Sequence, residues 1–240
     1  MAGFQRLSVI VPCFNEATTI ERLLARVLAA DTLGLGLEVV VVDDGSSDDS
    51  AAIIDRLAHS EPRLRLLRQD RNRGKGAALR RGLSAAEGDI LLIQDADLEY
   101  DPCDYPRLLR PFADQAADVV YGSRFRSGEA ARVLYFWHSL ANSLLTLLSN
   151  MCTNLNLTDM ETGYKVFRRE IVGRLQLRED GFGIEPEITA KIARLRPLPH
   201  IFEVGISYRG RTYDEGKKIG LRDAARALYC ILRYSLLPGS

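Results

Sequence analysis

Residues 90–99 read ILLIQDADLE, an apolar run followed by acids at alternate positions. Alternate side chains of an extended chain point to the same face, so a strand that continues into this segment would gather Asp95, Asp97 and Glu99 at its exit. Carboxylate oxygens suit Mg²⁺ or Mn²⁺, which often share their coordination sphere with substrate phosphates. We therefore predict a divalent-cation site at these acids, with a solvated acidic turn as the alternative.

Apolar runs of the same kind alternate with amphipathic segments through the first half of the chain. The predicted strands cover residues 7–13, 37–42, 64–67 and 89–93, and the predicted helices cover residues 17–30, 48–59 and 75–86. Strands of continuous Val, Ile and Leu, each followed by a helix, are typical of a parallel sheet covered on both faces. The sequence therefore predicts an α/β fold, a single Rossmann-like domain with a mostly parallel central sheet and helices on both faces.

Polar clusters follow three of these strands. Asn15 and Glu16 come after the first strand, residues 43–46 after the second, and residues 95–99 after the fourth. The carboxyl ends of parallel strands form the binding edge of such a sheet. We expect the three clusters to share one crevice.

The bulk composition narrows the choice of partners. The chain of 240 residues has 32 Lys+Arg and 32 Asp+Glu, so its net charge does not support general nucleic-acid binding. Its four cysteines lack the spacing of a zinc site or a disulfide framework, and its first residues lack the features of a secretory signal. We expect a cytoplasmic protein with no nucleic-acid partner.

Two segments of the second half are candidates for contact with a membrane surface. Residues 133–158 contain no Asp, Glu, Lys or Arg, but their recurrent His, Ser and Asn make a poor membrane span. We expect a core helix there, with a helix in the lipid interface as the alternative. A basic helix over residues 221–237 could lie on an anionic lipid surface or pack on the body. Peripheral attachment to the cytoplasmic membrane face therefore stays open.

Four short motifs occur in order along the chain: VPCFNE at 11–16, VDDGS at 42–46, DAD at 95–97 and GSRF at 122–125. Together they make the chain resemble a family 2 glycosyltransferase of the GT-A type, in particular the dolichyl- or polyprenyl-phosphate mannose and glucose synthases. The resemblance covers nearly the whole chain. It implies one GT-A domain over residues 1–240, with a nucleotide-sugar-binding half (1–125) and an acceptor-facing half (126–240).

The resemblance assigns roles to the polar clusters. It implies that four residues at the ends of the first two strands hold the base and ribose of the nucleotide: Pro12, Asn15, Glu16 and Asp44. It also implies that Asp95 and Asp97 bind Mg²⁺ or Mn²⁺ together with the donor diphosphate. Glu99 stands where many of these synthases have Gln, and it would add a further ligand oxygen.

The second half carries the other residues that the resemblance implies. Arg124 corresponds to an arginine that contacts phosphate, a task suited to its forked donors, with a surface ion pair as the alternative. Residues 158–167 resemble a segment beside the transferred sugar, where Asp159 is preferred to Glu161. Lys217 or Lys218 would reach the donor phosphate from a basic loop. His138 falls at or near the place of a second phosphate-binding arginine, which it would replace only in part; packing in the helix is the alternative.

The reaction implied by the resemblance is metal-dependent, inverting transfer of a hexose to a polyprenyl or dolichyl phosphate from a donor of the GDP-mannose or UDP-glucose type. A phosphate monoester has a second pKa of about 6, so it is ionised near neutrality and needs no base. The alternative is a hydroxyl acceptor on a sugar, protein or cell wall. Such an acceptor must lose a proton, which gives Asp159 the role of general base.

Other classes fit less well. A sugar-nucleotide pyrophosphorylase would need a glycine-rich loop after the first strand, and residues 11–16 contain no glycine. A dehydrogenase would need a GxGxxG at the same place. A non-catalytic nucleotide-sugar-binding module is a distant third alternative, because a fold alone does not confer activity.

Overall fold

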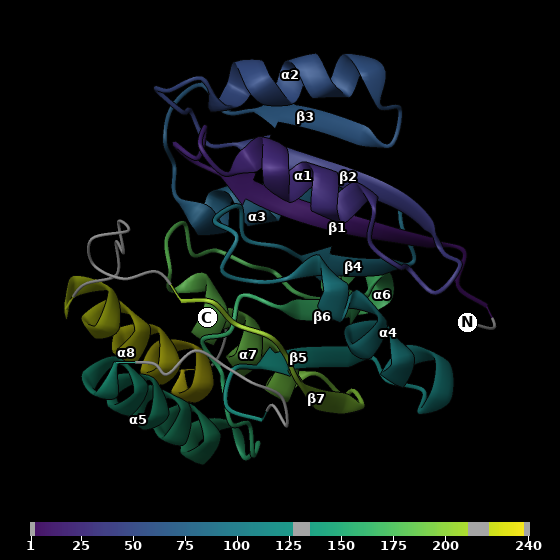
Figure 1. Ribbon diagram of the computed structural model, residues 1–240. Coiled ribbons are helices and arrows are strands. Elements are labelled where there is room, and N and C mark those ends of the chain that lie inside the picture. Colours follow the sequence, from purple (N-terminus) through teal and green to yellow (C-terminus); the bar gives the residue numbers. More distant parts are fainter. Residues whose placement is uncertain (1–2, 127–134, 211–220, 238–240) are drawn as a thin grey trace.

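A seven-stranded sheet in the order β3-β2-β1-β4-β6-β5-β7 runs through the molecule (Figure 1). The computed structural model describes residues 3–126, 135–210 and 221–237. The strands are β1 (Arg6–Cys13), β2 (Gly36–Asp43), β3 (Leu64–Arg68), β4 (Ile90–Ile93), β5 (Val119–Ser123), β6 (Lys165–Arg168) and β7 (Ile201–Gly205). Strand β6 is antiparallel to its neighbours β4 and β5, and the other strand pairs are parallel. The predicted, mostly parallel sheet is confirmed.

Helices cover both faces of this sheet, as predicted. They are α1 (Ile20–Leu28), α2 (Ser50–Ser60), α3 (Lys75–Ala85), α4 (Tyr105–Asp114), α5 (Phe136–Thr153), α6 (Arg169–Gly173), α7 (Ile184–Arg194) and α8 (Leu221–Leu236), with a short 3₁₀ helix η1 (Pro102–Asp104) before α4. Alternate residues of β1 enter opposite cores: Val9 and Val11 pack with α1, α2 and α4, and Ile10 packs with α3 and α7. Both faces of the central strands are therefore apolar, which explains their continuous Val and Ile.

The strand register brings the three polar clusters to one edge of the sheet. Cys13 at the end of β1 pairs with Asp43 at the end of β2, and Ile93 at the end of β4 pairs with Ile10 of β1. The segments that follow these three strands therefore leave the sheet on the same side. The three clusters thus lie along one edge, and the expected common crevice stays a prediction.

Helix α5 does not have the buried apolar face expected of residues 133–158. Polar side chains of α5 face the protein: Thr146 Oγ1 accepts a hydrogen bond from the backbone N of Met160, and Asn150 Nδ2 donates to the carbonyl of Leu157. Large apolar side chains of the same helix are exposed, among them Trp137 at 75%. The expectation of a core helix is wrong, because α5 buries only a narrow strip, where Leu145 and Leu148 pack on the core beside these hydrogen bonds, and its wider apolar side is exposed.

Candidate active site

The chain turns sharply after β4 instead of remaining extended. The buried side chain of Gln94 accepts hydrogen bonds at Oε1 from the hydroxyls of Tyr105 (2.8 Å) and Tyr164 (2.7 Å), which fixes the exit from the strand. Leu98 has a φ of +62°, in the left-handed region that a non-glycine residue rarely adopts. We call residues 94–99 the acid turn. The predicted alignment of its acids on one strand face is wrong, because β4 ends at Ile93.

The three acids of this turn have different surroundings. Asp97 Oδ1 accepts a hydrogen bond from the backbone N of Glu99 (3.1 Å), and Glu99 Oε2 accepts one from the hydroxyl of Tyr208 (2.6 Å). Asp95 Oδ2 lies against Gly163, where a Cβ would come within 2.3 Å of it. Among the residues that the structure describes, no group of three or more His, Cys, Asp or Glu side chains is placed to hold a metal ion.

A buried ion-pair chain stands behind the acid turn. Lys75 Nζ, at the start of α3, lies 2.8 Å from Asp95 Oδ1 and 2.9 Å from Glu185 Oε1 on α7. The other oxygen of Glu185 is paired with Lys165 of β6, whose ammonium group also donates to the carbonyl of Thr162. Lys165 and Glu185 are buried. Through Lys75, whose side chain is 15% exposed, Asp95 is thus connected to a buried glutamate and a buried lysine.

These ion pairs determine the protonation states of Lys75 and Glu185. Burial alone would lower the pKa of Lys75, but the carboxylates of Asp95 and Glu185 hold it well above its usual value. Burial would raise the pKa of Glu185, and the two lysines lower it instead. The positive charge of Lys75 therefore stays next to Asp95 at neutral pH.

Arg124 and Asp159 form a second buried pair, at the end of β5. The backbone N and Nε of Arg124 donate to Asp159 Oδ2 at 3.0 and 2.7 Å, and its Nη2 donates to Oδ1 at 2.6 Å. Asn142 of α5 joins both: it accepts from Arg124 and donates to Asp159. Asp159 is fully buried, so this carboxylate orients the guanidinium. The ion pair named as the alternative for Arg124 is present, but it is buried rather than on the surface.

An Asp159→Asn variant tests this positioning role. We expect a loss of about 2–3 kcal/mol in the free energy of unfolding, because a buried arginine loses its counter-charge, and a fall in Tm of about 5–10 °C. Turnover on a phosphate acceptor, measured well below Tm, should stay within about tenfold of wild type. The control is Asp180→Asn, which removes an ion pair whose carboxylate is 67% exposed. An unchanged Tm with abolished turnover would instead identify Asp159 as a base.

The loop after β1 is joined to the loop after β2. Asn15, with a φ of +54°, accepts a hydrogen bond at Oδ1 from the backbone N of Ser47 (2.8 Å), and its own backbone N donates to Ser46 Oγ (3.0 Å). Glu16 accepts at Oε2 from Thr19 Oγ1 (2.7 Å). These contacts hold the two loops of the binding edge together.

Asp44 extends this edge to the segment after β3. It is buried, and it accepts hydrogen bonds from the side chain of Gln69 (2.6 Å) and from the backbone N of Arg73 and of Gly74 (both 2.8 Å). Pro12 lies beside it in β1, paired in register with Val42. The observed role of Asp44 is therefore to fix residues 69–74, and a contact between Asp44 and a nucleotide remains a prediction.

Comparison with known proteins shows the family of this chain. Residues 8–175 match the model of glycosyl transferase family 2. The chain belongs to glycosyl transferase family 2. Two relatives are each 30% identical to it: dolichol-phosphate mannosyltransferase of Pyrococcus furiosus over 216 residues, and undecaprenyl-phosphate 4-deoxy-4-formamido-L-arabinose transferase of Pseudomonas syringae over 219 residues. These matches cover 89% and 90% of this chain, and 60% and 61% of the relatives. The chain thus spans about three fifths of the length of these relatives.

Solved structures show the same fold. Glucosyl-3-phosphoglycerate synthase from Mycobacterium tuberculosis, in complex with Mn²⁺, uridine diphosphate and phosphoglyceric acid, matches with a TM-score of 0.75 and 24% identity. The match covers all of this chain and 81% of that one. The predicted resemblance to family 2 and the predicted GT-A fold are both confirmed.

The carboxylates of the acid turn have the oxygen chemistry that suits a hard divalent cation such as Mg²⁺ or Mn²⁺. Mg²⁺ and Mn²⁺ sites are often built from one or two carboxylates, with substrate phosphates completing the shell, so a cage of protein ligands is not required. Asp95 and Asp97 are only partly buried and two residues apart, with Lys75 limiting the excess negative charge. These two acids would hold the cation, and Glu99 would orient Tyr208 rather than serve as the main ligand.

Three further residues were predicted to bind phosphate. Lys217 and Lys218 lie outside the described residues. His138 is in the first turn of α5, with its ring centroid 6.0 Å from that of Tyr135. Their phosphate-binding roles stay predictions.

In the part of the chain that the structure describes, Glu161 has an oxygen without a hydrogen-bond partner, unlike Asp159, which was the preferred candidate for the position beside the transferred sugar. Glu161 Oε1 and the neighbouring Thr162 Oγ1 are buried without a hydrogen-bond partner among the described residues. Burial, reinforced by the negative charge of Glu185, raises the pKa of Glu161 to about 7. A carboxyl that ionises near neutrality can exchange a proton under physiological conditions.

The sequence motifs did not indicate a role in the site for Lys75, Lys165 or Glu185. A signal for the first was present in the sequence, because Lys75 stands between two glycines. Gly74 has a φ of +97°, and a Cβ at Gly74 or Gly76 would come within 2.4 or 2.2 Å of the carbonyls of residues 180 and 179. This close approach of α3 to the segment before α7 brings Lys75 to Glu185.

Proposed function

We propose that this chain transfers a sugar from a nucleotide diphosphate sugar to a polyprenyl phosphate, with inversion and with a divalent cation. The observation that carries the proposal is the acid turn, where two partly exposed carboxylates meet a buried ammonium at the binding edge of a family 2 fold. The names of the relatives, a dolichol-phosphate mannosyltransferase and undecaprenyl-phosphate sugar transferases, support the choice of acceptor.

Each residue of the site has a separate role in the proposed reaction. Asp95 and Asp97 would hold the cation, which when bound neutralises charge on the leaving diphosphate. Lys75 keeps a fixed positive charge at the same place, and Asp159 orients the guanidinium of Arg124. The acceptor phosphate is already ionised and attacks without a base. A reaction without a base agrees with the environment of Asp159, because both of its carboxylate oxygens already accept hydrogen bonds from Arg124 or Asn142.

A donor panel tests the proposal. The protein is incubated with UDP- and GDP-sugars and a short polyprenyl phosphate, with Mg²⁺, Mn²⁺ or chelator, and the extracted lipid is analysed by mass spectrometry. We expect a glycosylated lipid phosphate with one donor class, and none in chelator. Absence of sugar transfer from every donor, despite donor binding in calorimetry, would support a non-catalytic binding module.

The outer side of α5 and α8 gives the proposed enzyme a route to a lipid acceptor. The two helices pack side by side (Figure 1). Together they expose a set of large apolar side chains: Phe136, Trp137, Leu140, Leu144, Leu147 and Met151 on α5, and Leu228, Tyr229, Leu232 and Leu236 on α8. None of the helices in the described part of the chain is long and apolar enough to cross a bilayer. We propose that this apolar face lies in the lipid interface.

Vesicle binding tests this face, and the chain carries its own probe. Trp137 is the one tryptophan of the sequence and is exposed on α5. Its fluorescence should shift to the blue when vesicles of phosphatidylglycerol and phosphatidylcholine are added. The double variant Leu144→Asp/Leu147→Asp should bind these vesicles at least about 100-fold more weakly, because two apolar side chains each contribute about 1.5–3 kcal/mol.

A matched control uses another exposed leucine. Leu198 lies between α7 and β7 and is 50% exposed, so Leu198→Asp adds a charge outside the apolar face. It should bind vesicles like wild type. A wild-type protein whose tryptophan spectrum does not change with vesicles would contradict the membrane proposal while leaving sugar transfer untouched.

One observation favours a second candidate function, transfer to a hydroxyl. Such an acceptor needs a base, and Glu161 offers a buried carboxyl with a pKa raised to about 7. A base must be ionised, so turnover on a hydroxyl acceptor would rise as the pH passes through about 7. Glu161→Gln would abolish that rise, whereas transfer to a phosphate would keep its pH profile.

A further inference from the structure

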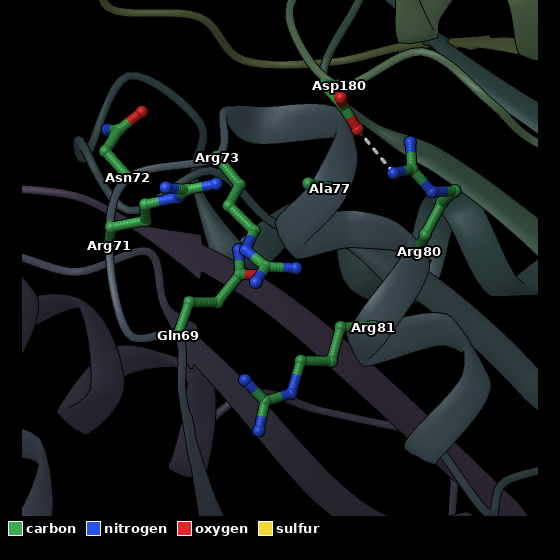
Figure 2. A pocket seen from close by; sticks show the side chains of 8 residues that line it. All are labelled: Gln69, Arg71, Asn72, Arg73, Ala77, Arg80, Arg81 and Asp180. Carbon is green, nitrogen blue, oxygen red and sulfur yellow. Dashed lines mark hydrogen bonds and ion pairs between the residues drawn. The ribbon is translucent and has the colours of Figure 1, made fainter.

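A pocket of about 700 Å³, open to solvent, lies between α3 and the segment that follows β3 (Figure 2). Four arginines line it, Arg71, Arg73, Arg80 and Arg81, against a single carboxylate, Asp180. The chain as a whole has equal numbers of basic and acidic residues. The excess of positive charge is therefore a local feature of this arginine pocket, and none of its lining residues belongs to the acid turn or the buried ion-pair chain.

Two of the arginines are fixed in the wall by the protein. Arg80 pairs with Asp180 and donates to the carbonyl of Glu179, and Arg81 donates to the carbonyl of Arg68. The one carboxylate of the pocket is thus already engaged. It does not neutralise the remaining guanidinium groups.

The other two arginines extend into the same space from residues 69–74 (Figure 2). Their backbone is held firmly: Asp44 accepts from the backbone N of Arg73, and a Cβ at Gly45 would come within 2.5 Å of the backbone of Arg71. Within the described ranges, neither Arg71 nor Arg73 has a carboxylate partner for its side chain. Like charges that are brought together on a fixed backbone repel each other, and a bound anion would relieve this repulsion.

We propose that the arginine pocket is a second anion site, which binds a ligand with two or more phosphate groups. Guanidinium groups bind phosphate oxygens in pairs, and the cavity has the size of a small-molecule site. The ligand is either a free phosphorylated compound or the phosphorylated headgroup of a lipid. The proposal goes beyond the proposed transfer reaction and does not depend on it, since no residue of the acid turn takes part.

Isothermal titration with inorganic tripolyphosphate in chelator tests the site without a metal. We expect Arg71→Ala/Arg73→Ala to bind tripolyphosphate at least about tenfold more weakly than wild type, because the variant loses two charge-assisted contacts. The control Arg22→Ala/Arg110→Ala removes the same charge from α1 and α4, on the other face of the sheet, and should bind within about twofold of wild type.

Vesicles that contain a phosphatidylinositol bisphosphate separate the two sources of the ligand. If Arg71→Ala/Arg73→Ala also reduces sedimentation with these vesicles relative to phosphatidylcholine vesicles, the ligand is a lipid headgroup; unchanged sedimentation assigns a free compound. Equal tripolyphosphate affinity in Arg71→Ala/Arg73→Ala and wild type, or no measurable binding to wild type, would overturn the proposal. Neither result would bear on sugar transfer, which the donor panel measures separately.

Discussion

An Asp97→Asn protein should fold like wild type and lose sugar transfer by on the order of 1,000-fold, equivalent to about 4 kcal/mol of transition-state stabilisation. Asp97 is partly buried in a turn, and its replacement keeps the acceptor that receives the backbone N of Glu99. What the variant removes is one of two negative charges available to a cation. The measurement is turnover with saturating donor over a range of Mn²⁺ concentrations, together with the Tm.

The control for this variant is Asp114→Asn, which removes an exposed acid at the end of α4. Its turnover should equal that of wild type. Undiminished transfer by Asp97→Asn, or by wild-type protein in chelator, would show that the acid turn does not act through a metal.

Glu185→Gln should be the most destabilising exchange in the site, with a loss of about 3–5 kcal/mol in the free energy of unfolding. The variant leaves the ammonium group of Lys165 buried without a counter-charge and removes one of the two acids that hold Lys75. Lys75 would then depend on Asp95 alone. We expect an apparent affinity for Mn²⁺ at least about tenfold weaker, because Asp95 is drawn into a tighter pair with Lys75.

Glu187→Gln is a matched control on the same helix. Glu187 is also buried and pairs with a lysine, Lys191, but it faces the backbone of residues 178 and 179 instead of the acid turn. It should lower stability in urea unfolding and leave Mn²⁺ affinity within about twofold. Equal effects of both variants on Mn²⁺ affinity would show that Glu185 has a structural role only.

The strand pattern predicted the sheet because each buried strand has its own local sequence signal. The runs 9–11, 39–42 and 90–93 are continuously apolar, which only a strand covered on both faces requires. The order of the polar clusters along one edge follows from parallel pairing. The family motifs then identified the GT-A fold.

The side-chain partners of the site could not be predicted in the same way. Lys75 and Glu185 are 110 positions apart, and nothing local in either segment indicates the other. Arg124 and Asp159 were both recognised from motifs, but their pairing became visible only when the fold placed β5 beside the segment before β6. The alternation of acids at 95–99 was misleading, because it assumed an extended chain where tyrosine hydroxyls hold Gln94 at the start of a turn.

The apolar segment at 133–158 shows another limit of pattern reading. A helix with one apolar and one polar side can present either side to the protein, and composition alone favours the apolar one. In α5 the inner side carries Asn142 and Thr146, which bind Arg124 and the backbone of Met160. The result is an exposed apolar face on the helix that contacts Arg124.

Acceptor competition tests the central proposal most directly. One reaction contains the donor, the cation, a short polyprenyl phosphate and the same polyprenol without its phosphate, and both lipids are followed by mass spectrometry. We predict that only the polyprenyl phosphate is glycosylated. Its phosphate is already ionised and attacks without a base, whereas the hydroxyl of the polyprenol would need a base to remove its proton. Glycosylation of the polyprenol at a comparable rate, lost in Glu161→Gln, would contradict the account and establish a hydroxyl acceptor.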